Sequence, residues 1–250
     1  MKLFAAALLA ATLIYAAPHQ RIPEETAQLL VVTTKDWQSP DAILQRYERV
    51  KKGWRSVGKG FPVITGKNGL GWGRGIHQIP SDAKIVKKEG DGKAPAGIFR
   101  LKNAFGYQPF EIAYPYKVYR ETDHCVDDGK SRWYNHIVDS TKVKQDYQSF
   151  ERMKFPRNYY RYGLVVDHNP DAVPGAGSCI FMHIKKPQHL PTVGCTAMSE
   201  KEIKMVLKWL DPKKHPLLIQ APRSEMPKLL PFRIRYKKES SKNSISSSNR

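Results

Sequence analysis

One segment, residues 178–199, holds the residue types that a cysteine-dependent enzyme needs. In it, His183 is followed by a loop of about a dozen residues and then by Gly194 and Cys195. An imidazole that takes the proton of a nearby thiol produces a thiolate nucleophile. Backbone amides from Gly194 to Thr196 are placed to bind the negative charge that develops on an attacked carbonyl oxygen. The segment therefore predicts a nucleophilic Cys195–His183 pair beside an oxyanion site.

Two other interpretations of these residues stay open. Cys195 could be an inert buried thiol, as free cysteine often is, and His183 could be an ordinary strand residue. Alternatively, His183, His189 and Cys195 could bind zinc. The sequence has no short paired-ligand motif such as CxxC or HExxH, which argues against zinc. The residues alone therefore give zinc less support than a nucleophilic pair.

Two strands are expected to position the histidine. Residues 162–168 and 178–184 are rich in apolar and β-branched types, with a turn at residues 173–177 between them. Period-two alternation along the second strand puts Cys179, Phe181 and His183 on one face. His183 is thereby expected near the end of a strand, where the loop to Cys195 begins.

A helix is expected shortly after the cysteine. Ser199 followed by Glu202 forms a capping box, which is typical of a helix start. One apolar face follows at helical spacing and consists of Ile203, Val206, Leu207 and Leu210. The positive end of such a helix lowers the pKa of a nearby thiol, so we expect it to favour the Cys195 thiolate.

The rest of the chain indicates many short strands and few helices. Residues 29–34 and 217–220 each predict a strand. Residues 39–41 resemble a helix start, and apolar residues recur at helical spacing up to Val50, which predicts a helix there. Residues 54–57 and 62–65 predict two paired strands around the glycines at 58 and 60. The fold class expected is β-rich mixed α/β.

The composition limits the classes of function. The chain has 250 residues and a formal net charge of +19, and 40% of its residues are apolar, which excludes wholesale disorder. The positive charge indicates an anionic partner, namely a cell-wall polymer or a membrane surface, unless it is simply a solvated basic surface. No zinc-finger spacing, RNA-binding aromatic motif or basic heptad region is present, so no nucleic-acid partner is expected.

The two ends differ from the rest of the chain. Residues 1–17 combine a positive start, an apolar stretch and small residues, which is typical of a secretory signal peptide. We therefore expect an exported protein, located in a periplasm or at a cell wall. Residues 237–250 are almost all Ser, Lys and Asn and predict a disordered basic tail. The globular part is expected at residues 27–236, and we expect it to be a monomer.

The catalytic segment resembles the signature of the L,D-transpeptidase family, the YkuD-like domain. That signature is a His, a loop, and then Ser/Thr-x-Gly-Cys, which here reads His183 and Thr192-Val193-Gly194-Cys195. Residues 90–99 resemble a second family block, Gly-Asp-Gly-Lys-Thr-Pro-x-Gly-x-Tyr/Phe. Residues 165–169 and 177–183 resemble one branch of the family. The resemblance covers about residues 60–221.

The resemblance implies a fold and a reaction. The fold is a β-sandwich-like mixed sheet with a few peripheral helices and the cysteine at a strand–loop–helix corner. Cys195 would attack the carbonyl of the diamino acid in a peptidoglycan tetrapeptide stem, and D-alanine, protonated by His183, would leave. An amine of a second stem would then resolve the thioester and form a 3→3 cross-link. The resemblance implies that this chemistry needs no metal, nucleotide or other cofactor. The alternatives are an L,D-carboxypeptidase or other hydrolase on the same scaffold, or a non-catalytic wall-binding module.

Two features depart from the family pattern. Many members carry Arg or Asn at or shortly after the catalytic Cys, whereas residues 196–198 here are Thr-Ala-Met. We therefore expect Thr192, His168, Asn169 or a lysine of the 185–186 pair to contact the substrate. The aromatic-rich region 107–162 matches no general family block and is interpreted as an insertion that forms either a lid or a packed cap.

Two further features have a structural interpretation. The Gly-Asp-Gly-Lys residues 90–93 favour a tight turn and are interpreted as scaffold near the site. The chain has three cysteines, and after export Cys125 and Cys179 could pair, which would leave Cys195 as the free thiol.

Overall fold

The computed structural model describes residues 22–234. The expected signal peptide and basic tail therefore lie outside the described residues. Ten strands form a large sheet and three form a small one. None of the helices within residues 22–234 is long and apolar enough to cross a membrane.

The strands of the large sheet have the following bounds: β1 Gln28–Thr34, β2 Asp41–Val50, β3 Gly53–Ile64, β4 Leu70–Trp72, β5 Ala94–Gly106, β6 Tyr116–Val118, β10 Tyr162–Val166, β11 Phe181–Ile184, β12 Thr196–Met198 and β13 Leu217–Pro222. The small sheet consists of β7 Asp123–Val126, β8 Ile137–Asp139 and β9 Phe150–Arg152. The helices are α1 Glu200–Trp209 and α2 Met226–Leu229, with short 3-10 turns η1 Pro187–His189 and η2 Pro212–Lys214.

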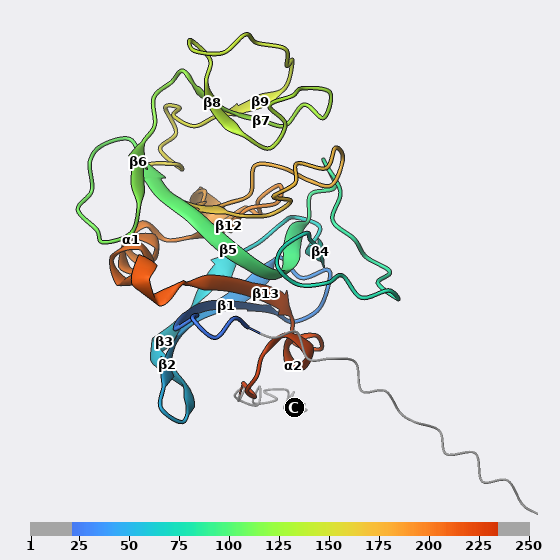
Figure 1. The fold of residues 1–250 in the computed structure, drawn as a ribbon, viewed down its shortest axis with the longest axis vertical. Helices are drawn as coiled ribbons and strands as arrows, with labels where there is room; N and C mark the ends of the chain where they lie inside the picture. Colours follow the sequence, from blue (N-terminus) through green and yellow to red (C-terminus); the bar gives the residue numbers. More distant parts are fainter. Residues whose placement is uncertain (1–21, 235–250) are drawn as a thin grey trace, which may run out of the picture.

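The large sheet closes on itself. Its strands run in the order β10-β11-β12-β3-β2-β1-β13-β5-β4, β6 also pairs with β5, and an additional pairing joins β10 to β5 (Figure 1). Closure is possible because β5 is long and pairs with β13, β10, β4 and β6 along its length. β1 lies between β2 and β13, and all seven of its residues are buried.

The core inside the sheet is filled from both the strands and α1. Apolar side chains that the strands point inward meet the apolar face of the helix, and this cluster includes Leu30, Leu44, Phe99, Leu164, Met182, Ile203, Val206 and Leu207. The capping box is confirmed, because the Ser199 side chain accepts from the Glu202 amide and the Glu202 side chain accepts from the Ser199 amide. The predicted strands at 29–34 and 217–220 are also confirmed as β1 and β13.

Three local predictions were wrong. Residues 41–50 form strand β2 rather than a helix, because β1 and β3 pair with its two edges and its burial alternates. Residues 53–64 form one strand, β3, rather than two paired ones, and the register with β2 shifts between Leu44 and Arg46. The strand expected from residue 178 begins at Phe181, because Cys179 has a positive φ of 55° that a strand does not allow.

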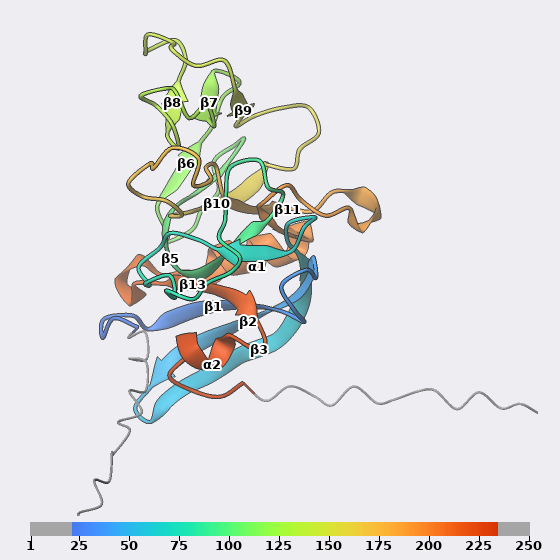
Figure 2. The same ribbon diagram turned by 90° about the vertical axis from the view of Figure 1, so that its right-hand side faces the viewer.

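The small sheet lies at one end of the molecule, beyond β10 and β11 (Figures 1 and 2). Its order is β8-β7-β9, and all three strands fall inside region 107–162. A disulfide between Cys125 on β7 and Cys179 joins it to the large sheet, with the two Cα atoms 5.9 Å apart. The pairing that the sequence left open is thus present, and Cys195 is the free cysteine.

Candidate active site

Adjacent parallel strands bring the predicted pair together. β11 and β12 are in register at Met182–Thr196 and His183–Ala197, so Cys195, just before β12, lies beside Phe181. The Phe181 amide donates to the Cys195 sulfur at 3.3 Å. His183 is two residues further along β11, a step of about 7 Å. The thiol and the imidazole therefore face the same cavity from neighbouring strands.

We call this cavity the larger active-site cavity. It has a volume of about 450 Å³. Its lining residues come from the loop before Cys195, from β11 and from the end of region 107–162: Glu151, Arg152, Phe155, Arg157, Tyr159, Tyr160, His183, Lys186, Thr192, Val193 and Cys195. A substrate in this cavity would thus meet both the nucleophile and its base.

Cys195 is buried as a neutral thiol. Burial raises the pKa of the thiol, and the nearby negative charge of Glu151 raises it further. The Phe181 amide and Lys87 oppose that rise. The thiol itself donates to the Cys179 carbonyl at 3.7 Å. The resting site therefore holds the thiol rather than the thiolate, and a base must remove its proton during the attack.

His183 has the protonation state that such a base requires. Burial lowers its pKa to about 4, and the positive charge of Lys186 acts in the same direction. Its Nδ1 lies 2.8 Å from the Ile184 carbonyl oxygen. A carbonyl can only accept, so Nδ1 carries the proton and Nε2 has the free lone pair. The Tyr160 ring packs edge-on at 5.1 Å between centroids and helps to hold the imidazole.

Thr192 closes the turn that presents the cysteine. Its hydroxyl donates to the Cys195 carbonyl oxygen at 2.6 Å and accepts from the Gly194 amide at 3.1 Å. A Cβ on Gly194 would come within 3.2 Å of the Lys93 carbonyl oxygen and 3.3 Å of an Ile180 methyl group. The Thr192 hydroxyl therefore bonds to both sides of the turn, and Gly194 packs closely against its neighbours.

The expected oxyanion role of the amides stays a prediction. The Gly194 amide is engaged by Thr192 in this structure. Thr196 lies at the start of β12, and its side chain donates to the Gln220 side-chain oxygen at 2.7 Å. A substrate contact of Thr192 also stays a prediction, although Thr192 lines the larger active-site cavity.

The prediction that a helix dipole lowers the pKa of Cys195 was wrong. Strand β12 separates Cys195 from the start of α1 at Glu200. The effect of a helix dipole falls off within the first turn, so it does not reach the sulfur. Burial dominates, and the pKa of Cys195 is raised rather than lowered.

The structure does not bring His168 and Asn169 into this cavity. His168 is 2% exposed, accepts from the Arg74 amide and lies 3.0 Å from the Ala176 carbonyl oxygen. The Asn169 side chain is fully buried and bonds to backbone groups of Val173 and Gly177. Both side chains hold the loop at 169–177 in place, and neither is free to bind a substrate beside Cys195.

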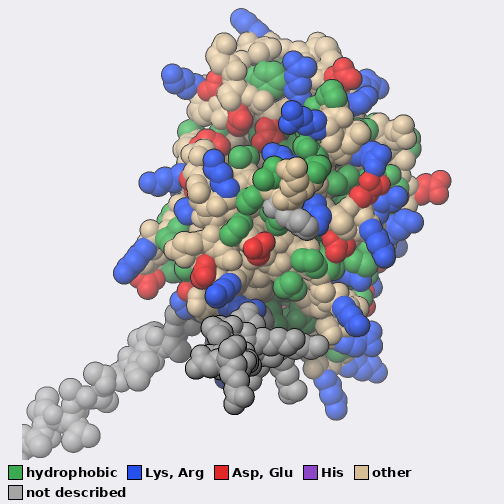
Figure 3. All heavy atoms as spheres, turned by 180° about the vertical axis from the view of Figure 1, so that it is seen from behind, with side chains coloured by type: hydrophobic (Ala, Val, Ile, Leu, Met, Phe, Trp, Pro, Cys, Tyr) green, Lys and Arg blue, Asp and Glu red, His purple; other side chains and the backbone are tan. Residues whose placement is uncertain are grey.

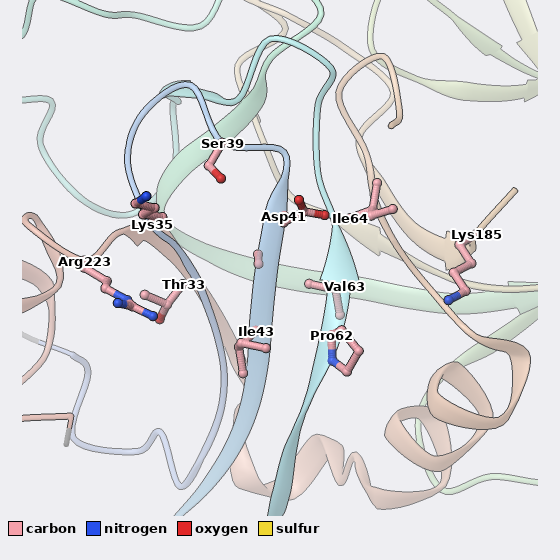
Figure 4. A pocket seen from close by; sticks show the side chains of 11 residues that line it. Thr33, Lys35, Ser39, Asp41, Ile43, Pro62, Val63, Ile64, Lys185 and Arg223 are labelled. Atoms are coloured by element: carbon pink, nitrogen blue, oxygen red, sulfur yellow. The ribbon is translucent and has the colours of Figure 1, made fainter. Parts of the chain in front are cut away.

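The two consecutive lysines point into different cavities. Lys186 lines the larger active-site cavity. Lys185 lines a separate cavity of about 510 Å³ over the ends of β2 and β3, with Arg223 on the opposite side of the two strands (Figure 4). Of the expected pair, only Lys186 is placed to meet a substrate in the larger active-site cavity.

The sequence reasoning missed several residues of the site. Arg152, Arg157, Glu151 and Tyr160 line the larger active-site cavity. All four belong to region 107–162, which carries no family motif that could have identified them. Tyr160 donates to a Glu151 carboxylate oxygen at 2.5 Å. Region 107–162 therefore supplies one wall of the site, and a function as a movable lid stays a prediction.

A smaller active-site cavity of about 230 Å³ lies on the other side of Cys195. It shares Glu151, Val193 and Cys195 with the larger one, and its other lining residues are Lys67, Lys87, Glu89, Gly90, Gly92, Asp127, Ser178, Cys179, Ile180 and Gly194. The nucleophile is thus reached from two cavities.

The Gly-Asp-Gly-Lys residues form the expected turn beside this smaller cavity. Asp91 accepts from the Lys93 amide at 2.9 Å and from the Lys87 ammonium at 2.7 Å. Gly90 and Gly92 have φ values of 68° and 67°, which glycine adopts without strain. The interpretation as scaffold near the site is confirmed. Among the described residues, no group of three or more His, Cys, Asp or Glu side chains is arranged to hold a metal ion.

In this β-rich fold a buried cysteine and a buried histidine line one cavity, which is the arrangement that a protein with a cysteine nucleophile and a histidine base requires. Residues 43–219 match the YkuD family model, the L,D-transpeptidase catalytic domain. The chain belongs to this family, so the predicted family is confirmed. The particular branch suggested by residues 165–169 and 177–183 stays a prediction.

The crystal structure of the helical cell shape determining protein Pgp2 from Campylobacter jejuni is similar, with a TM-score of 0.38 and 14% sequence identity. The likeness covers 80% of this chain and 49% of that chain, so this chain spans about half the length of that structure. No curated protein matches the sequence.

Proposed function

We propose that this protein is an exported cysteine L,D-transpeptidase that acts on peptidoglycan tetrapeptide stems and forms 3→3 cross-links. The observation that carries the proposal is the shared cavity of Cys195 and His183, which are held on adjacent strands with the thiol and imidazole both neutral. Family membership supports the peptide-stem substrate.

In the first half-reaction, His183 Nε2 takes the thiol proton while the sulfur attacks the carbonyl carbon of the diamino acid. The C–N bond to D-alanine then breaks, and His183 returns the proton to the leaving amine. The products are a thioester on Cys195 and free D-alanine. Because both groups start neutral, this step requires no ion pair in the resting enzyme.

In the second half-reaction, an amine of another stem attacks the thioester carbonyl. His183 accepts a proton from that amine, the C–S bond breaks, and the proton passes to the departing sulfur. The product is a new amide between two stems. Two cavities that meet at Cys195 support transfer, because donor and acceptor need separate approaches to one sulfur. Water in the acceptor position would make the protein an L,D-carboxypeptidase.

The charges around the site also support an anionic substrate. Arg152, Arg157 and Lys186 line the larger active-site cavity and can pair with stem carboxylates. The net charge of +19 suits an anionic wall polymer or membrane surface. On the face seen in Figure 3, Lys and Arg side chains are spread over the surface rather than gathered in one patch. Export is supported by the Cys125–Cys179 disulfide, because such bonds persist in oxidising compartments.

The proposal is tested by incubating purified protein with tetrapeptide muropeptides and identifying the products by mass. A dimer lacking one alanine is expected for transfer, and a tripeptide monomer indicates hydrolysis. The Cys195→Ala variant should release no D-alanine. Wild-type protein that binds the wall but leaves the muropeptides unchanged would instead indicate a non-catalytic binding module.

A further inference from the structure

Strand β9 of the small sheet places the acidic side chain of Glu151 in the same cavities as the nucleophile. On β9, Glu151 lies opposite Cys125 of β7. Cys125 is disulfide-bonded to Cys179, whose carbonyl oxygen is 3.7 Å from the Cys195 sulfur. A strand pairing and a covalent bond thus link the backbone of Glu151 to the backbone beside the thiol, and this linkage fixes Glu151 over the site.

Glu151 lines both active-site cavities, as Cys195 and Val193 also do. Its carboxylate accepts a hydrogen bond from Tyr160 at 2.5 Å, and the Tyr160 ring packs against His183. The side chain is therefore held by a rigid neighbour and is not free to swing into solvent. This carboxylate is therefore part of the wall of both cavities that reach the thiol.

The smaller active-site cavity has an unusual concentration of negative charge. Glu89, Asp127 and Glu151 all line it, and among the described residues Asp127 Oδ1 is buried without a hydrogen-bond partner. Of its lysines, Lys87 is ion-paired with Asp91. Lys67, which is exposed, also lines the smaller cavity. The charged groups that line the larger cavity beside Glu151 are Arg152, Arg157 and Lys186.

These neighbouring negative charges raise the free energy of the site when no ligand is bound. Burial, together with the charges of Asp127 and Glu89, raises the pKa of Glu151 to about 7. The negative charge of Glu151 in turn raises the pKa of Cys195. A positively charged group beside Glu151 would relieve both effects, because it favours the carboxylate and cancels the charge that opposes the thiolate.

We propose that Glu151 binds the side-chain ammonium of the diamino acid whose carbonyl Cys195 attacks. This inference rests on the proposed function and specifies its donor substrate. The attacked carbonyl and the side chain leave the same Cα, so the ammonium lies within one side-chain length of the sulfur. Glu151 is the carboxylate that lines both approaches to that sulfur.

The ion pair between Glu151 and the substrate ammonium couples substrate recognition to activation of the nucleophile. With the site empty, burial and the charge of Glu151 together keep the thiol protonated. With the ammonium bound, the charge facing Cys195 is neutralised and proton transfer to His183 becomes easier. A stem without a free side-chain amine would bind but would not activate the thiol.

The first test uses wild-type protein and two tetrapeptide stems, one with a free side-chain amine and one with that amine acetylated. D-alanine release should be at least about tenfold faster, in kcat/KM, from the free-amine stem, as expected for loss of one buried charge contact. Equal rates would overturn the inference while leaving the proposed function intact. Release from neither stem would overturn the proposed function, and the inference with it.

The second test uses Glu151→Gln, with Glu121→Gln as a matched control, because Glu121 is exposed in the same region 107–162. Glu151→Gln should lose the preference for the free amine, and Glu121→Gln should keep it. Without substrate, the pH profile of Cys195 alkylation should move down by about one pH unit in Glu151→Gln only. A preserved preference or an unmoved profile would overturn the inference, and circular dichroism checks that each variant is folded.

Discussion

The hydroxyl of Thr192 donates a 2.6 Å hydrogen bond to the carbonyl oxygen of Cys195, three residues further along the chain. The Thr192 hydroxyl oxygen also accepts a hydrogen bond from the Gly194 amide at 3.1 Å. One side chain thus fixes the backbone on both sides of the turn that presents the nucleophile. Thr192 is a positioning residue for Cys195.

Replacing Thr192 by Val removes both hydrogen bonds and keeps the shape of the side chain. We expect kcat for D-alanine release to fall by about tenfold or more, because a displaced nucleophile loses its attack geometry. KM should change little, and Thr192→Ser should restore most of the rate. A Thr192→Val enzyme with wild-type kcat would show that the turn holds without the hydroxyl.

His183 is expected to be indispensable for the chemistry. In His183→Ala no group accepts the thiol proton, so the rate of D-alanine release should fall by about 100-fold or more. Cys195 should still react with a small alkylating reagent at high pH, where hydroxide removes the proton. Loss of alkylation as well would indicate that the variant is misfolded rather than missing its base.

The buried titratable groups make stability depend on pH. His168 and His183 have pKa values of about 4 in the folded state, below the ordinary histidine value of about 6.5. The unfolded state therefore binds more protons between those values, and the free energy of unfolding falls as pH drops through this range. Glu151, with its pKa raised to about 7, acts in the opposite direction because its folded form binds the extra proton.

Two histidines outweigh one glutamate, so we expect the wild-type protein to lose about 2 kcal/mol between pH 7 and pH 4.5. The loss should be smaller in His183→Gln and larger in Glu151→Gln. Urea unfolding at several pH values measures all three. The same slope in all three proteins would mean that neither side chain titrates as the structure indicates.

The Cys125–Cys179 bond is expected to matter for stability and for activity. It closes a separation of 54 residues, so replacing both cysteines by alanine should cost about 2–4 kcal/mol of unfolding free energy. Activity should fall further than stability explains, because β9 and Glu151 lose their link to the nucleophile. Non-reducing peptide mapping checks the bond, and a fully active double variant would contradict its positioning role.

Binding to isolated cell wall should weaken as salt is added. The charge of +19 attracts anionic polymer through long-range electrostatics, which salt screens. Co-sedimentation from about 50 mM to about 500 mM salt measures this, and Cys195→Ala should behave like the wild type. Binding that does not change with salt would point to specific contacts instead.

Features that depend on neighbours in sequence were predictable. The Ser199–Glu202 capping box and the helix face behind it follow from local backbone and side-chain bonding. The strands at 29–34 and 217–220 are apolar runs of ordinary strand length. The Cys195–His183 pair was expected from residue types and spacing, and the two side chains do line one cavity.

Features that depend on distant partners were not predictable. Residues 41–50 have apolar residues at helical spacing, yet two neighbouring strands make them β2. The pKa of Cys195 is raised rather than lowered because burial and Glu151 act on it, and no local pattern contains either. His168 and Asn169 have suitable chemistry, but the fold uses them to hold a loop.

The sequence by itself indicated the proposed pair, His183 and Cys195, and the capped helix that follows it, because residue type and short-range spacing are enough to indicate both. Only the tertiary structure decided that region 107–162 supplies Glu151 and Tyr160, and that Cys125 bonds to Cys179. The physical reason is that burial, charge proximity and strand pairing depend on which distant segments meet. Those contacts set the ionisation of the thiol and the shape of the cavities that lead to it.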